Sequence, residues 1–489
     1  MKLKRLLFLP LLSVLLIIRP LESYAFSIPY DSYNYDYREY IHFTPAPYVP
    51  AGNINISSYT YNGEEIGTMV TPQDICKDAS GNIYIADTGN NRIVVLNKDL
   101  KTVTDVIDSF DNNGTTDTFN QPYGVCVSAD GNLYVADSQN KRVVELSRDH
   151  TLVKIISEPK SESIEDGFVF TPLKITVDYA GRVYVIAQNM FEGIMVFETN
   201  GNFSSFFGTI DVPISLWDKF WKRIATKEER LKQKLYIPTE FTGLDIDPSG
   251  FVYSTNIDSE GIQGVRRLNP KGEDVIKKGS NKNLGGDLVY AGTTDYSGPS
   301  QFTDVVYRQN GIYSCLDKKR GRIFSYDHEG NLLYIFGGLG SQRGTFKLPV
   351  AIEDMGDKIL VLDATKAEII SFDVTEYGRL INEAVSLRYE GNEASAVDIW
   401  RRVLEIDEDN ELANVGIGKA YLTSGDYESA MKYLKLGMNK DYYSIAFRRF
   451  RNGLLSRNAG MFLTAAAVII VALSIVKAVR KRKSGAQNE

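Results

Sequence analysis

Histidine and cysteine are scarce in this sequence of 489 residues, which contains three of each. The histidines His42, His150 and His328 show neither the His-x-His nor the HExxH spacing of zinc sites. The sequence also lacks a Cys-x-x-Cys pair, a G-x-S-x-G nucleophile turn and a G-x-x-x-x-G-K-[ST] phosphate loop. We therefore expect no catalytic residues, no metal and no cofactor.

Positive charge is not in excess either, because the formal net charge is −7. Domains that bind nucleic acid usually present a basic face. We therefore expect no nucleic-acid partner. The length allows two or three domains, at least one with a large core.

The N-terminus has the layout of a signal peptide. Lys2, Lys4 and Arg5 precede the 13-residue apolar run Leu6–Ile18, which is too short to span a bilayer comfortably. Small side chains at Ser23 and Ala25 fit cleavage after Ala25. We predict a signal peptide over residues 1–25, with an uncleaved anchor as the alternative.

Near the other end, Ala459–Val476 is an 18-residue run without formal charge, at the lower limit of transmembrane length. We predict one membrane-spanning helix here, followed by a basic tail over residues 477–489; a helix buried in a soluble core is the alternative. Arginines also precede the run, at positions 448, 449, 451 and 457. Because both flanks are basic, the excess of positive charge on the cytoplasmic side is only a weak guide to the orientation of the helix. Orientation therefore depends on the signal peptide, which predicts a single-pass protein with its large domain extracytoplasmic and its C-terminus cytoplasmic.

Between the two ends the sequence repeats itself. The segment T-P-Q-D-I-C-K-D-A-S-G-N-I-Y-I-A-D from Thr71 aligns without gaps with Q-P-Y-G-V-C-V-S-A-D-G-N-L-Y-V-A-D from Gln121, 50 residues later. A third copy begins at Thr171, and weaker copies begin at Phe241, Phe302 and Leu348. Six copies of this length indicate radially repeated sheets.

Each copy places a glycine between two alternating strands, where a hairpin turn requires positive φ. These glycines are Gly81, Gly131, Gly181, Gly250, Gly311 and Gly356. A third strand follows in each copy, and a fourth is plausible in most. The fold class predicted is mainly β, a six-bladed β-propeller over residues 53–376, followed by a helical module and one transmembrane helix.

Two segments carry a resemblance to a known family. A-D-T-G-N-N-R-I (Ala86–Ile93) and A-D-S-Q-N-K-R-V (Ala136–Val143) resemble the repeat motif of NHL proteins, with Asn91 and Lys141 in place of the histidine. The resemblance is strong in the first two copies, fair in the third and weak in the others. It implies a propeller built from NHL repeats.

Aspartate and arginine recur in this motif, as Asp87 with Arg92 and Asp137 with Arg142. One interpretation is a ligand-facing charge pair. The other is a structural turn, in which the aspartate accepts backbone N–H groups and the arginine holds a neighbouring strand. Recurrence favours the structural interpretation, because a single binding site would not be repeated.

Three carboxylates, Asp74, Asp245 and Asp304, lie early in the predicted innermost strands. They could converge at the channel mouth and bind a cation, or could simply line a wet channel. Asp245 and Asp304 fall at similar distances from the leading phenylalanine of their copies. Cys76 and Cys126 occupy equivalent repeat positions, so we expect buried thiols there and no disulfide.

Three segments lie outside the repeats. Residues 26–52 form a Tyr- and Pro-rich lead-in, expected to pack loosely or to act as a spacer, and Ile54–Tyr61 is predicted to add the outer strand that closes the sixth blade. An insert over residues 212–236 is predicted to be an amphipathic helix that packs on the propeller rim or contacts lipid or a partner. Its candidate interaction residues are Trp217, Phe220, Trp221, Lys222 and Arg223.

After the propeller, residues 379–455 show helical periodicity with two copies at an offset of 34 residues. G-K-A-Y-L-T-S-G-D-Y-E-S-A-M-K-Y-L (Gly418–Leu434) resembles a tetratricopeptide repeat, and a plain helical stalk is the alternative. Gly418 and Ala430 would let paired helices approach closely.

These features favour a membrane-anchored binding or scaffolding protein. Its propeller and helical surfaces would bind protein or glycan partners, as an accessory to membrane transport or envelope assembly. The alternative is a propeller lyase or hydrolase acting on extracellular sugars or peptides, which the scarcity of histidine disfavours.

Overall fold

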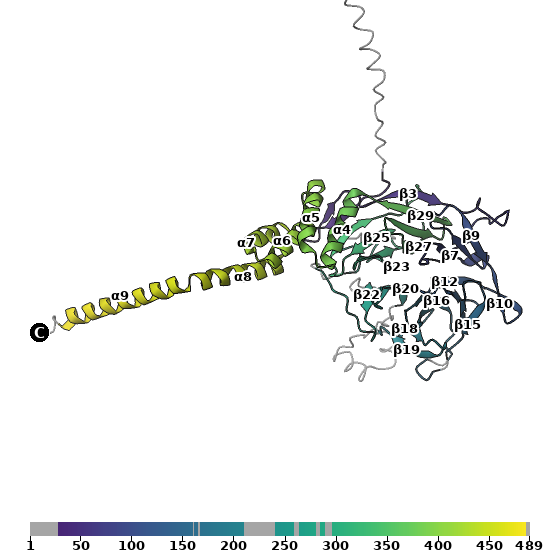
Figure 1. Cartoon of the computed structure of the whole chain (residues 1–489), viewed down its shortest axis with the longest axis horizontal. Coiled ribbons are helices and arrows are strands. Elements are labelled where there is room, and N and C mark those ends of the chain that lie inside the picture. Colours follow the sequence, from purple (N-terminus) through teal and green to yellow (C-terminus); the bar gives the residue numbers. More distant parts are fainter. Residues whose placement is uncertain are drawn as a thin grey trace, which may run out of the picture.

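The computed structural model describes residues 28–159, 161–164, 167–209, 240–258, 264–279, 284–288 and 296–485. The predicted signal peptide and the predicted insert helix lie outside these residues. Six antiparallel sheets are arranged around a central axis as the blades of a β-propeller, and the innermost strand of the sixth blade lies beside that of the first (Figure 1).

The blades follow one another along the chain, each beginning with its innermost strand. Blade 1 contains β6 (Asp74–Lys77), β7 (Ile83–Asp87), β8 (Arg92–Leu96) and β9 (Val103–Ile107); blade 2 contains β12 (Pro122–Val127), β13 (Leu133–Asp137), β14 (Arg142–Leu146) and β15 (Leu152–Ile156); blade 3 contains β16 (Pro172–Val177), β17 (Val183–Ala187), β18 (Ile194–Phe197) and β19 (Phe203–Phe207). Blade 4 contains β20 (Phe241–Ile246), β21 (Val252–Asn256) and β22 (Val265–Leu268) among the described residues; blade 5 contains β23 (Phe302–Tyr307), β24 (Tyr313–Asp317), β25 (Arg322–Tyr326) and β26 (Leu332–Phe336); blade 6 contains β27 (Pro349–Asp354), β28 (Lys358–Asp363) and β29 (Glu368–Val374). The six-bladed, mainly β fold predicted from the repeats is confirmed.

The hairpins between the first two strands of every blade depend on glycine. All six predicted turn glycines have φ between 74° and 86°. These are Gly81, Gly131, Gly181, Gly250, Gly311 and Gly356. A left-handed backbone at the same repeat position explains why glycine recurs there.

Ring closure uses a different segment from the one predicted. The outer strand of blade 6 is β3 (Tyr48–Ile54), which pairs with β29 from Ile54 opposite Ile369 to Tyr48 opposite Val374. The prediction of Ile54–Tyr61 as this strand is therefore wrong, and Thr60–Tyr61 instead forms the short strand β4, paired with β5 (Glu64–Glu65). Tyr48 is fully buried against Phe336, with the ring centroids 4.8 Å apart, and this packing fixes the register.

The lead-in is also more firmly attached than we expected. Its strand β1 (Tyr33–Tyr35) pairs with β26 and with β2 (Ile41–Phe43), extending blade 5 to six strands. The hydroxyls of Tyr33 and Tyr35 both donate to the buried carboxylate of Asp287. The lead-in is therefore part of the folded domain.

Two small elements complete the β domain. A hairpin of β10 (Ser109–Asn112) and β11 (Thr115–Thr118) follows blade 1, and the 3₁₀ turn η1 (Thr88–Asn90) lies between β7 and β8. The hairpin packs Phe110 against Phe119, with the ring centroids 5.4 Å apart.

Six helices follow the propeller. They are α4 (Glu376–Tyr389), α5 (Glu393–Ile406), α6 (Glu411–Ser424), α7 (Tyr427–Leu436), α8 (Lys440–Arg457) and α9 (Ala459–Gly485). Five of them, α4 to α8, have an Asn, Asp or Thr at the N-cap whose side chain accepts a backbone N–H. Consecutive helices pack against one another from α4 to α8.

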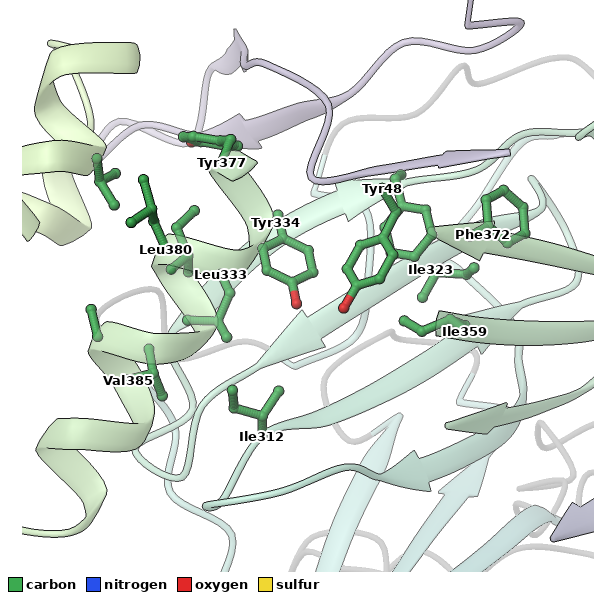
Figure 2. Packing of buried hydrophobic residues seen from close by; sticks show 14 of the residues in the cluster. Tyr48, Ile312, Ile323, Leu333, Tyr334, Ile359, Phe372, Tyr377, Leu380 and Val385 are labelled. Atoms are coloured by element: carbon green, nitrogen blue, oxygen red, sulfur yellow. The ribbon is translucent and has the colours of Figure 1, made fainter. Parts of the chain in front are cut away.

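Helix α4 attaches the helices to the propeller. Figure 2 shows Tyr377, Leu380 and Val385 of α4 facing Leu333 and Tyr334 of blade 5. All five side chains are buried in one core that also includes Tyr48 and Phe372 of blade 6. The propeller and the first helices therefore share a hydrophobic core.

Small residues allow the next helices to approach closely. A Cβ on Gly418 of α6 would lie 2.6 Å from Leu434 Cγ of α7, and Ala430 is fully buried. Tyr421 and Tyr433 stack beside this contact. Helix α9 then leaves the domain as an extended arm (Figure 1), and its segment Ala459–Arg480 is apolar and long enough to cross a membrane, with none of it buried.

Candidate functional site

The wall of the central channel is made by the six innermost strands, and their pairing registers define two equivalent positions in each blade. The first position is Asp74, Gly124, Lys174, Gly243, Asp304 and Ala351 in blades 1 to 6. The second, two residues later, is Cys76, Cys126, Thr176, Asp245, Val306 and Glu353. Asp245 and Asp304 therefore do not share a position. The residue of β20 that matches Asp304 of β23 is Gly243, two residues before Asp245.

At the first position, one lysine crosses the channel. The ammonium of Lys174 forms an ion pair with Asp74 of blade 1 and lies 3.5 Å from Oδ2 of Asp304 in blade 5. All three side chains are buried. Blades 2 and 4 have glycine at the first position, Gly124 and Gly243, which leaves room for these side chains. A Cβ on Gly243 would lie 2.7 Å from Oδ1 of Asp304.

The channel carboxylates also join neighbouring blades. Asp74 accepts the Val125 N–H at 3.0 Å, and Asp304 accepts the Ile352 N–H at 3.0 Å. At the second position, the same geometry links Asp245 to Tyr307 N at 2.5 Å and Glu353 to Lys77 N at 3.1 Å. In each case the carboxylate satisfies a backbone donor of the next blade, and Glu353 does so across the junction between the last blade and the first.

Burial shifts the protonation of these groups. Burial, followed by the charge of Glu353, raises the pKa of Asp245 to about 8. Burial also raises the pKa of Asp304 to about 7, against the attraction of Lys174. For Lys174 burial acts to lower the pKa, but Asp304 and Asp74 outweigh it, so the pKa is raised and the ammonium stays charged.

Little space remains in the channel. A cavity of about 60 Å³ lies among these side chains and the half-buried Cys76 and Cys126, which are free thiols. That volume holds a few water molecules and no sugar or peptide. Among the described residues, no group of three or more His, Cys, Asp or Glu side chains is placed to hold a metal ion.

The recurrent motif pairs lie away from the channel, at the turns between β7 and β8 and between β13 and β14. Asp87 and Asp137 are fully buried. Asp87 accepts Val70 N at 2.7 Å and Arg92 Nε at 2.8 Å, and Asp137 accepts Asn120 N at 2.7 Å and Arg142 Nε at 2.8 Å. Each aspartate therefore ties the segment that enters its blade to the turn.

A second polar network runs from the channel wall to α4. Arg308, which follows β23, donates to Asp354 at 2.9 Å and to the Tyr334 hydroxyl at 2.8 Å. Tyr334 in turn donates to Asn382 of α4 at 2.7 Å, and Arg308 also bonds the Tyr48 hydroxyl. This buried network connects blades 5 and 6, the ring-closing strand and the first helix.

A larger cavity lies where the propeller meets the helices. We call this cavity, of about 660 Å³, the joint cleft; it is lined by the β1–β2 hairpin, by the loop before β26, and by residues at the ends of α5 to α8. Its carboxylates are Asp36, Asp407, Glu408, Asp409, Glu411 and Asp441, and its basic side chains are His42 and Lys440. Burial raises the pKa of Glu411, helped by Asp36. The cleft is large enough for a peptide segment or a sugar.

Sequence reasoning identified some of these residues and missed others. It proposed Asp74, Asp245 and Asp304 but not Lys174 or Glu353, although the aligned copies place a charged residue at one of these two positions in every blade except blade 2. The joint cleft was missed entirely, because its walls come from segments about 370 residues apart. The candidate residues Trp217, Phe220, Trp221, Lys222 and Arg223 lie outside the described residues.

The fold and channel define a six-bladed β-propeller followed by six helices, the last of them long and apolar. The NHL repeat family model matches residues 70–96 and 119–146, which cover most of blades 1 and 2, so these two blades are similar to NHL repeats. No curated protein matches it.

Solved structures resemble the chain only distantly. A catalytically inactive virginiamycin B lyase from Staphylococcus aureus, with quinupristin, is 11% identical with a TM-score of 0.40, covering 68% of this chain and 90% of the lyase. Hydrazine synthase from Kuenenia stuttgartiensis is 11% identical with a TM-score of 0.39, covering 65% and 99%. A protein of unknown function from Bacteroides thetaiotaomicron is 14% identical with a TM-score of 0.42, covering 71% and 90%. At these similarities the matches carry no functional argument.

Proposed function

We propose that this protein is a membrane-anchored extracytoplasmic scaffold, whose propeller and tetratricopeptide-like helices bind protein or glycan partners close to the membrane. The observation that carries the proposal is the position of α9. An apolar segment without a buried residue extends from a folded domain whose other hydrophobic elements share common cores. Such a segment is stable in a lipid bilayer and unfavourable in water.

Binding rather than catalysis is supported by the way the channel carboxylates are used. Asp74, Asp245 and Asp304 each accept a backbone N–H of the next blade, and the Lys174 ammonium neutralises two of them. The open volume lies instead at the joint cleft. Its excess of carboxylates favours a cationic segment of a protein partner.

Membrane fractionation tests the anchor. The full chain should stay with membranes through carbonate washing and be released by detergent, and deletion of residues 459–485 should release it to the soluble fraction. External protease should digest the propeller in cells whose outer layers have been opened. A full chain that washes off with carbonate, or a propeller protected from external protease, would contradict the proposal.

Charge reversal tests the binding surface. A Glu408→Lys, Asp409→Lys variant changes two exposed carboxylates of the joint cleft, and an Asp398→Lys, Glu405→Lys variant makes the same charge change on exposed positions of α5 outside the cleft lining. Affinity capture with the full chain should recover envelope or membrane proteins that the cleft variant loses and the control retains. Recovery of only cytosolic proteins, or equal recovery by both variants, would contradict it.

A further inference from the structure

Helix α8 has two dissimilar halves. Its N-terminal half belongs to the folded domain, because Ala446 is fully buried and Tyr442, Tyr443 and Ile445 pack on the cluster around Leu434. Every side chain of its C-terminal half, residues 447–457, is exposed except that of Phe450, which is half-buried. This C-terminal half, which we call the collar, therefore contributes little to the core.

The collar combines arginine with exposed apolar side chains. Arg448, Arg449, Arg451 and Arg457 make no ion pair with a carboxylate in the described part of the chain. The sequence contains no acidic residue between Asp441 and Glu489. Four guanidinium groups thus share a helical segment with no internal counter-charge.

Three of the four apolar side chains of the collar lie on one side, the fourth being Leu455. Phe447, Phe450 and Leu454 fall at i, i+3 and i+7, so they line one face of the helix. The side chains of Phe447 and Leu454 are 47% and 49% exposed. Arg451 and Arg457 flank this face, and their aliphatic stems can lie along it while their charged ends reach outward.

The collar is held at a fixed distance from the apolar arm. Asn458 separates α8 from α9, and its side chain bonds the Leu454 carbonyl while its own carbonyl accepts from Phe462 N. At 1.5 Å per residue, Arg457 lies about 3 Å and Arg448 about 16 Å before Ala459 along the helix axis. These distances cover the polar headgroup zone of a bilayer, about 5–8 Å deep, and the water directly above it.

Resting on the membrane anchoring proposed above, we propose that the collar binds anionic phospholipid headgroups in the leaflet that faces the propeller. Guanidinium groups form bidentate hydrogen bonds with phosphate, and the end of the apolar face nearest α9, at Leu454, lies at headgroup depth. Basic residues near a membrane surface each strengthen its binding to anionic lipid about fivefold. The contact holds the helices and the joint cleft at the membrane surface.

Hydrogen exchange on the full chain in vesicles tests this contact locally. The chain is reconstituted in vesicles of phosphatidylcholine alone or with phosphatidylglycerol, and exchange is followed in peptides covering residues 447–457. We expect slower exchange with phosphatidylglycerol, reversed by high salt, and unchanged when soluble glycerol phosphate is added to phosphatidylcholine vesicles. Equal exchange in the two vesicle types would overturn the proposal, as would an effect of soluble glycerol phosphate that matches the lipid.

Matched variants separate the collar from other basic groups. Arg448→Gln with Arg451→Gln should reduce the lipid-dependent protection on the order of tenfold or more. Lys432→Gln with Lys435→Gln, which removes the same charge from exposed positions of α7, should leave it unchanged. Equal loss in both variants would mean that general charge attraction suffices and would overturn the collar as the site. Flotation with the vesicles reports anchoring separately, so a chain that does not float contradicts the anchor and not the headgroup contact.

Discussion

Blades 2 and 5 use the same two sequence positions in different ways. In blade 2, Arg142 opposite Asp137 donates to it at 2.8 Å and also binds Asp117 of the preceding hairpin. In blade 5, Arg322 stands opposite Asp317 in the same register, yet it donates to the carbonyls of Asp31 and Gly337 and lies over the Tyr33 ring. The arginine of blade 2 stabilises its own blade, whereas that of blade 5 holds the lead-in.

The comparison shows why the motif weakens along the chain. Blades 1 and 2 contact few added elements, and their Asp–Arg pairs remain intact. Blades 5 and 6 contact the lead-in, the ring-closing strand and α4. Residues at the repeat positions of these blades bind those added elements instead of pairing within the blade. Asp317 still accepts Gln301 N at 2.8 Å, but its ion pair is with Arg320 at 3.7 Å, and burial raises its pKa.

The largest effect should come from breaking the intact pair of blade 2. Asp137→Ala removes a fully buried carboxylate, leaves Asn120 N without its acceptor and removes one partner of Arg142. We expect a loss of about 3–5 kcal/mol in the free energy of unfolding, measured by chemical denaturation. Asp130→Ala, at an exposed turn of the same blade, should change it by less than about 0.5 kcal/mol. A loss of under about 1 kcal/mol for Asp137→Ala would show that the pair is not structural.

The next effect should come from the channel, where one lysine links blades 1, 3 and 5. Lys174→Met leaves Asp74 and Asp304 facing one another without a cation. We expect a loss of about 2–4 kcal/mol at pH 8 and a smaller loss near pH 5, because Asp304, with a pKa of about 7, is already protonated at the lower pH and gains little from the ammonium there. Thermal melts at the two pH values measure this difference. An equal loss at both would mean that packing rather than charge accounts for the effect.

Releasing the lead-in should have a moderate effect. Arg322→Gln removes two hydrogen bonds to backbone carbonyls and the contact with Tyr33, so we expect a loss of about 1–2 kcal/mol. Limited proteolysis should cleave the lead-in several-fold faster. Arg142→Gln is the matched variant in blade 2, and it should destabilise the domain without exposing the lead-in. If both variants exposed the lead-in equally, blade 5 would have no special role in holding it.

The smallest loss of stability should come from Asp245→Asn, since the native carboxyl, with a pKa of about 8, is itself largely protonated at neutral pH. A pKa raised in the folded state stabilises the fold below the unfolded pKa, and this contribution is lost as the pH rises through the folded value. The variant should therefore be closest to the native protein near pH 4 and gain on it from about pH 4 to about pH 8, the interval between the unfolded and folded pKa values. Parallel stability curves between pH 5 and 8 would contradict the raised pKa.

Features set by neighbouring residues in the sequence could be predicted, and features set by contacts between distant residues could not. The blades were predictable because Gly81, Gly131 and their equivalents mark local turns at a regular spacing. The closing strand was not, because Y-V-P-A-G-N-I is a poor strand sequence, and Pro50 lies at an irregularity in its pairing opposite Phe372. Tertiary packing of Tyr48 decides the outcome there.

The candidate site also combines residues that the repeat places and contacts that only the folded structure reveals. Asp74 and Asp304 could be placed in innermost strands from the repeat alone. Their connection through Lys174 could not, since it joins residues 100 and 130 positions apart across the channel. The joint cleft depends on how α4 docks on blades 5 and 6, which no local pattern encodes.

Closing the ring with β3 also sets the order in which the molecule can be completed. Strand β3 has its partner, β29, more than 300 residues later, so a ribosome must release almost the entire propeller before the first blade and the last can meet. Until then the early blades form an open arc whose terminal edges are unpaired. Long-range pairing of this kind slows folding and leaves nascent strands exposed to proteases and to one another. Because α4 begins two residues after β29 ends, closing the ring also brings α4 beside the blade 5 and blade 6 side chains on which it packs.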